Sequence, residues 1–257
     1  MLLHGFPEFW YGWRKQIDAL ANAGFRVIVP DQRGYNRSSK PAAVRDYRIS
    51  ELAADVTAIA DQLGAQKIFL AGHDWGAAVA WNTAMHFPDR VAKLAILNVP
   101  HPAIMIRALR RRPRQMLRSW YVLFFQIPRL PEWLISRNNF QRNVDALRKT
   151  SRPGIFSPED FANYRDAWSQ PGALTAMINW YRALRPSMPA RRVIVPTRII
   201  WGKRDAFLGS EMARESLEYC DRAELFEFPN ATHWVQHEEA EEVNRLLIEW
   251  FRSESAN

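Results

Sequence analysis

Short apolar runs rich in β-branched residues alternate with segments of helical spacing, and this alternation leaves few folds open to the chain. The apolar runs cover residues 25–30, 67–71, 91–99, 197–201 and 223–228. Residues 13–22, 49–63 and 77–86 repeat apolar side chains at helical spacing. A strand covered on both faces has a continuous apolar run, whereas a strand with one solvated face alternates. The pattern predicts an α/β fold with a mostly parallel sheet flanked by helices.

The strand pattern disappears between residue 100 and about residue 195. Aromatic and arginine-rich stretches of helical character, interrupted by prolines, replace it. Strand patterning resumes at Val193, and a last helix is expected over residues 238–253. A length of 257 residues fits one large domain or a core with an inserted lobe. We predict a core formed by residues 1–99 and 196–257 and an inserted helical cap, or lid, formed by residues 100–195.

The net charge of +8 comes from the predicted cap. Residues 101–195 contain 17 Lys and Arg against 5 Asp and Glu, whereas the remainder contains 18 against 22. The arginine cluster over residues 107–118 could attract phosphates or an anionic membrane, so a weak membrane contact stays open. A solvated helical face is the commoner reason for such a run. Since no nucleic-acid-binding motif accompanies it, nucleic acid is not an expected partner.

The single cysteine, Cys220, excludes an internal disulfide and a cysteine-rich zinc site. One cysteine fits a reducing compartment. No apolar run approaches the roughly 20 residues that span a bilayer, and no secretory signal is visible. These observations favour a soluble cytoplasmic protein, either a monomer or a homodimer.

The residues Gly72-His73-Asp74-Trp75-Gly76 stand between an apolar run and a helical segment. A tight strand-to-helix turn needs small residues two before and two after its apex, where side chains would collide with the strand and the helix. Asp74 is the apex, and its carboxylate would lie at a helix N-terminus, which favours negative charge. Such a carboxylate suits displacement at a saturated carbon, with an alkyl ester left on the enzyme. A helix-terminal Asp between incidental glycines is the plainer alternative.

Two further polar residues follow predicted strands. Asp205 comes after the strand that ends at Trp201, and His233 comes after the strand that ends at Phe228. Open α/β sheets place their sites beyond the carboxyl ends of strands. The order nucleophile, acid, histidine is that of a hydrolytic triad with His233 as the base and Asp205 as its orienting acid. Each residue taken alone is more often structural.

The run His4-Gly5-Phe6-Pro7-Glu8 follows the first apolar residues. A loop of this type can aim the backbone N–H of Phe6 at the same point as that of Trp75, which would form a two-donor oxyanion hole. A simple Gly-Pro turn is the alternative reading.

Seven phrases of the sequence, in order, resemble those of soluble-type epoxide hydrolases of the α/β-hydrolase fold. They are HGFPE at 4–8, DQRGYNRSSKP at 31–41, GHDWGA at 72–77, SWYVLFFQIP at 119–128, NWYRA at 179–183, GKRD at 202–205 and THW around His233. The resemblance implies Asp74 as nucleophile, His233 as base and Asp205 as its partner acid, without cofactor or metal. It also implies that Tyr121 and Tyr181 hydrogen-bond to the epoxide oxygen.

The two tyrosines also suit the chemistry. Opening an epoxide develops an alkoxide, and a phenol with a pKa near 10 can hydrogen-bond to it and donate a proton. Interfacial cap aromatics are the plainer reading of Tyr121 and Tyr181. The aromatic side chains near the motifs favour an apolar aryl or lipid epoxide. Predicted substrate contacts are His4, Trp75, Phe124 and Trp180.

The predicted reaction converts a small apolar epoxide and water to a vicinal diol through a covalent alkyl-aspartate ester. Haloalkane dehalogenases also resemble this chain, since Trp75 follows the nucleophile, but their halide site usually adds a second donor where this chain has Phe6. Fluoroacetate dehalogenases resemble it less, because they have Arg in place of Trp75. A non-catalytic relative that only binds is a third alternative, although a binder needs no base.

Epoxide hydrolases of this fold normally carry further strands before the HG phrase, whereas this chain has three residues ahead of His4. We therefore expect the N-terminal strands to be missing and one sheet edge to have unpaired backbone groups.

Overall fold

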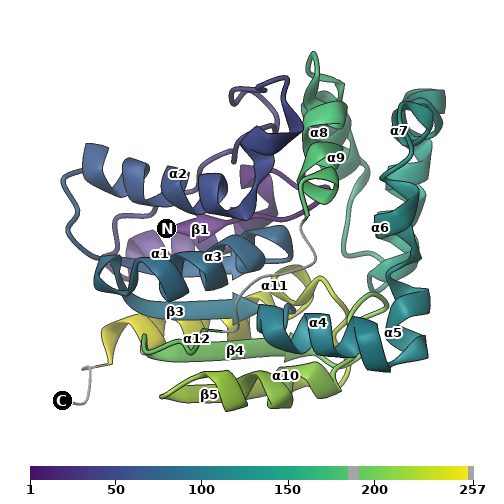
Figure 1. Cartoon of the computed structure of the whole chain (residues 1–257). Helices are drawn as coiled ribbons and strands as arrows, with labels where there is room; N and C mark the ends of the chain where they lie inside the picture. Colours follow the sequence, from purple (N-terminus) through teal and green to yellow (C-terminus); the bar gives the residue numbers. More distant parts are fainter. Residues whose placement is uncertain (185–190, 254–257) are drawn as a thin grey trace.

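The computed structural model describes residues 1–184 and 191–253. Within these residues, one five-stranded sheet has the order β1-β2-β3-β4-β5, and each pair of neighbours is parallel (Figure 1). The strands are β1 (Leu2–Leu3), β2 (Ile68–His73), β3 (Val91–Leu97), β4 (Thr197–Gly202) and β5 (Ala223–Phe228). The parallel pairing confirms the predicted α/β fold.

Helices cover both faces of the sheet. On β3, Leu94 and Ile96 pack into the apolar cluster that includes residues of α2 and α3, whereas Ala95 and Leu97 pack into the cluster that includes residues of α1 and α12. Successive side chains of a strand point to opposite faces, so a strand covered on both faces has no polar face. The helices are α1 (Arg14–Asn22), α2 (Ile49–Gln62), α3 (Trp75–His86) and α12 (Ala240–Arg252).

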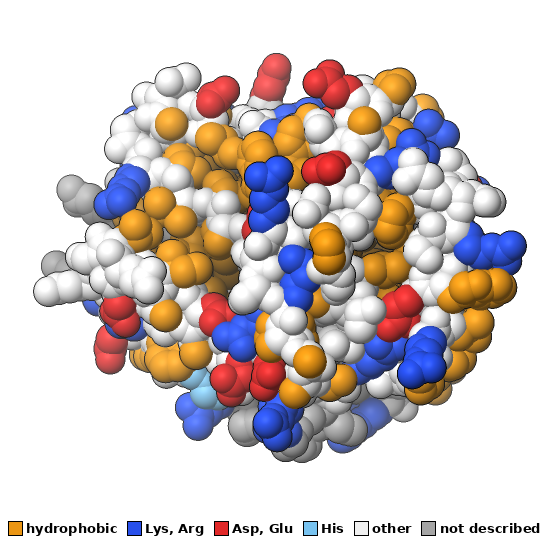
Figure 2. Space-filling model, turned by 90° about the horizontal axis from the view of Figure 1, so that it is seen from above, with side chains coloured by type: hydrophobic (Ala, Val, Ile, Leu, Met, Phe, Trp, Pro, Cys, Tyr) orange, Lys and Arg blue, Asp and Glu red, His pale blue; other side chains and the backbone are white. Residues whose placement is uncertain are grey.

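Helices account for most of the described chain between β3 and β4. Figure 2 shows the molecule from the side on which α8 and α9 lie. They are α4 (Pro102–Arg111), α5 (Pro113–Arg118), α6 (Trp120–Phe124), α7 (Leu130–Thr150), α8 (Pro158–Ser169) and α9 (Ala173–Arg182). The helix α7 is kinked, because Arg137 to Phe140 leave helical backbone angles. The division into a core of residues 1–99 and 196–257 and a cap of residues 100–195 stays a prediction.

Four of the five predicted strands are formed, with ends within two residues of the expected ones, but residues 25–30 form no strand. A backbone hydrogen bond of 2.9 Å joins Leu2 N to Ile28 O. Because β1 is two residues long, it pairs with β2 on one side but offers too few backbone groups on the other side for a ladder with residues 25–30. The last predicted helix is formed as α12, which begins two residues later than expected because Glu239 separates it from the short helix α11 (Val235–Glu238).

Candidate active site

Asp74 lies at the turn between β2 and α3 with φ of +50° and ψ of −126°. Residues other than glycine rarely adopt positive φ, and such strain gathers at functional sites. A Cβ atom on Gly72 would lie 2.4 Å from Gly76 O, and one on Gly76 would lie 2.1 Å from Leu3 O. Both contacts are with backbone, so the turn requires glycine at each position. The predicted strand-to-helix turn is therefore present.

His233 lies between two carboxylates. Its Nδ1 atom is 2.7 Å from Asp205 Oδ2, and its Nε2 atom is 3.4 Å from Asp74 Oδ2. His233 and Asp205 are buried, whereas the Asp74 side chain keeps 18% of its surface exposed. The structure thus brings the three predicted triad residues together and leaves Asp74 the one most open to solvent.

The Asp205 carboxylate is fixed by several donors. Its Oδ1 atom accepts from the backbone N–H groups of Phe207 at 2.7 Å and Leu208 at 2.9 Å. Its Oδ2 atom accepts from Asn98 Nδ2 at 2.8 Å and faces His233 Nδ1. A carboxylate held this way keeps the proton on Nδ1 and leaves Nε2 turned toward Asp74.

Asp74 and His233 shift each other's pKa, and the charge of Asp205 also acts on the histidine. Burial disfavours the charged form of His233, but Asp205 and Asp74 outweigh this effect and raise its pKa to about 10. Burial also acts to raise the pKa of Asp74, yet the hydrogen bond and charge of His233 leave it below its ordinary value. At neutral pH, Asp74 is therefore an ionised carboxylate beside an imidazolium, which is the state a nucleophile needs.

Backbone donors converge on the Asp74 carboxylate. Phe6 N–H donates to Asp74 Oδ1 over 2.6 Å. The Trp75 amide also hydrogen-bonds to Asp74 and lowers the pKa of this carboxyl. A Cβ atom on Gly5 would lie 2.2 Å from Asp74 Cβ, so the loop approaches this closely because residue 5 is glycine. The two predicted oxyanion donors thus lie at the predicted nucleophile.

Tyr121 of α6 and Tyr181 of α9 lie near Asp74. Their ring centroids are 5.9 Å apart, and the Tyr181 ring meets the Trp75 ring edge to face at 5.0 Å. Burial raises the pKa of both phenols, and the negative charge of Asp74 raises it further. Both side chains are therefore within electrostatic reach of the carboxylate and keep their protons at neutral pH.

Two of the predicted substrate contacts, His4 and Trp180, are buried and hydrogen-bond to a neighbouring loop. His4 is fully buried, and its Nε2 atom accepts a 3.1 Å hydrogen bond from the backbone N–H of Gln32. Trp180 is 1% exposed and donates its indole N–H to Arg33 O over 2.9 Å. Both side chains therefore support the loop of residues 31–39, and their predicted contact with substrate stays a prediction.

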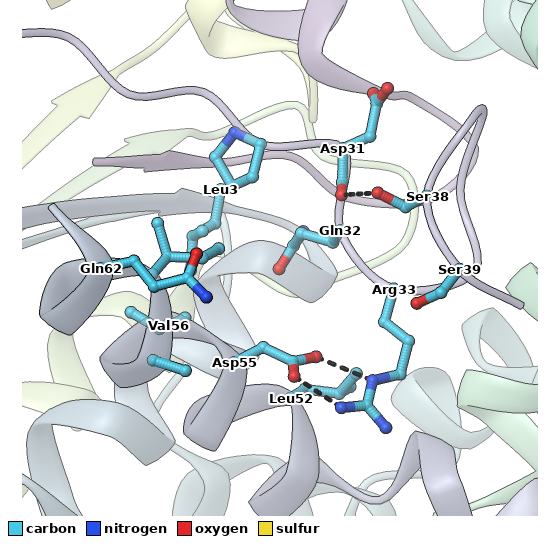
Figure 3. Close-up of a pocket in the computed structure, with 13 residues that line it drawn as sticks. Leu3, Asp31, Gln32, Arg33, Ser38, Ser39, Leu52, Asp55, Val56 and Gln62 are labelled. Carbon is cyan, nitrogen blue, oxygen red and sulfur yellow. Dashed lines mark hydrogen bonds and ion pairs between the residues drawn. The ribbon is translucent and has the colours of Figure 1, made fainter. Parts of the chain in front are cut away.

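That loop is held against α2. Arg33 donates to both carboxylate oxygens of Asp55, at 2.8 and 2.5 Å, and Ser38 Oγ donates to Asp31 O (Figure 3). These four residues help to line a cavity of about 210 Å³. Because the lining residues do not include Asp74, the cavity is separate from the site, and the ion pair serves to fix the loop.

Phe125 is the ring next to Phe124 that contacts the aromatic side chains beside Asp74, and the predicted contact of Phe124 with substrate stays a prediction. The Phe125 ring lies 5.5 Å from that of Phe6 and 4.8 Å from that of Tyr181, measured between centroids. The ring contacts of Phe124 are with Trp120 and Phe125. Neighbouring residues of a helix point in different directions, and an unbroken apolar run does not reveal which one faces the site.

Sequence reasoning missed two groups of supporting residues. Asn98, which fixes Asp205, follows β3, so the rule that polar residues beyond strand ends build the site would have found it. Glu8 is buried and accepts from Tyr164 Oη at 2.5 Å and from His237 Nε2 at 2.7 Å. In the sequence, Glu8 could have been recognised as the charged residue of the HGFPE phrase. These bonds hold the loop that carries the Phe6 donor.

Comparisons with known proteins identify the family of this chain. The family model described as alpha/beta hydrolase fold matches residues 1–131. The chain is 44% identical to an AB hydrolase superfamily protein of Bacillus subtilis, over 99% of this chain and 90% of the relative. It is 38% identical to epoxide hydrolase 4 of Mus musculus, over 99% of this chain and 73% of the relative.

The chain belongs to the epoxide hydrolases of the α/β-hydrolase fold. The solved structure of a mutant epoxide hydrolase from Bacillus megaterium superposes with a TM-score of 0.89 at 30% identity, covering 98% of this chain and 92% of that one. The family, the fold and the hydrolase class predicted from the sequence phrases are confirmed.

Within the described residues, no group of three or more His, Cys, Asp or Glu side chains is arranged to hold a metal ion. Among the same residues, no helix is both long and apolar enough to cross a membrane.

Proposed function

We propose that this epoxide hydrolase converts an epoxide and water to a vicinal diol through an ester on Asp74. The proposal rests on the observation that the two oxygens of the Asp74 carboxylate have different partners. Its Oδ1 atom accepts from Phe6 N–H, whereas its Oδ2 atom faces His233. Oδ2 is therefore the attacking oxygen, and Oδ1 becomes the carbonyl oxygen of the ester, already placed at its backbone donors.

In the first step, Asp74 Oδ2 forms a bond to a ring carbon while the carbon–oxygen bond of the epoxide breaks. The alkoxide that develops is far more basic than a phenolate, so Tyr121 or Tyr181 can give it a proton. Both phenols are protonated at neutral pH because burial and the charge of Asp74 raise their pKa. A halide leaving group would not need this proton, so the pair of phenols favours an epoxide.

In the second step, His233 must accept a proton from water. Esterification removes the negative charge of Asp74, which is one of the two charges that raise the pKa of His233. The imidazolium then loses its Nε2 proton to the tyrosinate through solvent, and the neutral imidazole, still oriented by Asp205, is a base suited to neutral pH. Water attacks the ester carbon, and the tetrahedral oxyanion on Oδ1 lies at the Phe6 and Trp75 amides.

Collapse of this intermediate releases the diol with the former Oδ2 atom, and the departing oxygen takes the proton of the newly formed Asp74 carboxyl group. The oxygen from water stays in the Asp74 carboxylate, and His233 keeps the proton it took from water, so the resting carboxylate and imidazolium are restored. Atoms and charges therefore balance over one cycle, and no cofactor takes part.

We further propose an apolar, aryl-bearing epoxide as the substrate class. The rings of Phe6, Phe125, Tyr121 and Tyr181 contact one another beside Asp74. An epoxide hydrolase from Bacillus megaterium with a TM-score of 0.89 to this chain has been solved with its product (R)-3-[1]naphthyloxy-propane-1,2-diol. An aryl diol of that kind matches an aromatic wall.

A parallel panel of epoxides and alkyl halides, with diol and halide release both measured, tests the function. We expect diol from aryl epoxides, little halide release, and no turnover by Asp74→Asn. Faster halide release than diol formation would instead establish a dehalogenase. Tight binding of aryl epoxides with no product of either kind would show a binding protein.

A further inference from the structure

Exposed apolar side chains gather on one part of the predicted cap. Of the twelve large hydrophobic side chains that are exposed in the described residues, seven lie between residues 116 and 133. We call them the outer cap face: Met116, Leu117, Trp120, Leu123, Ile127, Leu130 and Trp133. A monomeric surface rarely concentrates large apolar groups in this way unless something covers them.

The helix α6 divides its residues between the site and this face. Tyr121 of α6 and Phe125, the residue directly after it, point inward, where their rings contact that of Tyr181. Trp120 is 62% exposed and Leu123 is 77% exposed. The exposed residues therefore do not belong to the substrate pocket, although they share a helix turn with a proposed catalytic phenol.

Arginines surround the outer cap face with little acid among them. Residues 110–137 contain seven Arg and no Lys or Asp, and their one Glu, Glu132, is ion-paired with Arg182 at 2.6 Å. The exposed Arg110, Arg111, Arg114, Arg118 and Arg129 have no ion pair within the part of the chain that the structure describes. The face is therefore apolar and positively charged at once.

Figure 2 shows this mixture along its right-hand edge, the side on which Figure 1 places α5, α6 and α7. Hydrophobic and basic side chains lie there next to one another. A solvated helical face, the commoner explanation of the arginine run, accounts for the charge but not for the apolar side chains between the arginines.

We propose that the outer cap face docks on a bilayer that carries anionic phospholipids. Tryptophan and leucine side chains favour the boundary between headgroups and acyl chains, while arginines bind lipid phosphates. A second copy of this chain would set arginines against arginines, which repel. Nucleic acid would satisfy the arginines but leave Leu117, Trp120 and Leu123 in water.

Docking in this orientation would hold α6, and with it Tyr121, next to the membrane. An apolar epoxide dissolved in the bilayer would then reach the site without crossing water. The docking itself does not depend on the proposed function, because binding to vesicles is measured without a substrate.

Flotation with phosphatidylcholine vesicles, with and without phosphatidylglycerol, tests the proposal on the full chain. We expect binding only to the anionic vesicles, weakened by added salt because exposed charges are screened. The charge reversal Arg114→Glu with Arg118→Glu should lower the partition coefficient by about tenfold or more. Leu117→Asp should also weaken binding, while hydrolysis of a water-soluble epoxide continues in both variants.

Two matched controls lie at residues away from the outer cap face. Arg26→Glu with Lys67→Glu changes the net charge by the same amount, and Ile194→Asp replaces a side chain that is 56% exposed. Both controls should bind anionic vesicles within about twofold of the unmodified chain. Equal losses in the controls, or no binding to anionic vesicles at low salt, would overturn the proposal. So would a dimer that Leu117→Asp dissociates, since a second copy would then cover the face.

Discussion

The titration of His233 gives a direct view of how the site works, and Asp74→Asn is the change that exposes it. Asparagine keeps the shape of the side chain and tolerates positive φ, but it carries no charge. In this respect it imitates the ester, in which Asp74 is also neutral. The variant therefore reports the histidine as it would be in the second step of the reaction.

The expected size of the effect follows from the geometry. Asp74 Oδ2 lies 3.4 Å from His233 Nε2, and the pKa of the histidine is raised to about 10 in the presence of both carboxylates. A single opposite charge at this range shifts a pKa by about 1 to 3. We expect the pKa of His233 in Asp74→Asn to lie between about 7 and 9, still above its ordinary value of about 6.5 because Asp205 remains.

Proton NMR of the histidine ring resonances across a pH titration measures this shift, with His233→Gln identifying the signal among the six histidines. The pH dependence of folding stability gives a second measurement of the same pKa. A pKa raised on folding stabilises the protein fully below about pH 6.5, and the contribution is lost as the pH rises through about 10. In Asp74→Asn, this stabilisation, measured by urea unfolding, should be lost at a lower pH than in the unmodified protein.

An unchanged pKa of His233 in Asp74→Asn would refute the reasoning, because the Asp74 charge would then contribute nothing to the histidine. A pKa below 7 in the unmodified protein would refute it as well. In either case, esterification could not convert His233 from an acid into a base.

Four further substitutions give separate expectations. Tyr121→Phe and Tyr181→Phe should each slow ester formation by about 10- to 100-fold in stopped-flow fluorescence, and the double variant by about 1,000-fold or more; a double variant within threefold of normal would contradict the phenols' role. Asn98→Ala removes a donor to Asp205 and should lower the free energy of unfolding by about 1 to 3 kcal/mol in urea titrations. Gly76→Ala places a Cβ atom against backbone and should cost at least about 3 kcal/mol or prevent folding; normal stability would disprove the close approach.

Much of the fold is predictable because the periodicity of apolar residues reflects burial. The strand β5 spans the predicted residues 223–228, and β2 to β4 lie within two residues of their expected ends. Residues 25–30 have the same composition but form no strand, since strand formation also needs a partner, and β1 is too short to provide one. The apolar composition of a segment indicates that its residues are buried, whereas its pairing as a strand depends on distant parts of the chain.

The site was predictable where a rigid motif fixes the geometry and less so where a side-chain direction decides it. Asp74 and the Phe6 amide follow from glycines that a close approach requires. The choice between Phe124 and Phe125 depends on the rotation of a short helix, which an unbroken apolar run leaves open. His4 lies in a site motif yet points inward to support a loop.

The fate of the water oxygen tests the central claim most directly. After many turnovers in oxygen-18 water, mass spectrometry of the peptide that contains Asp74 should find the label in that side chain, since water attacks the ester carbon. The peptide that contains Asp205 and the Asp74→Asn protein are the controls and should remain unlabelled. Label that appears in the diol from the first turnover, with none in Asp74, would mean that water opens the epoxide itself and that no ester is formed.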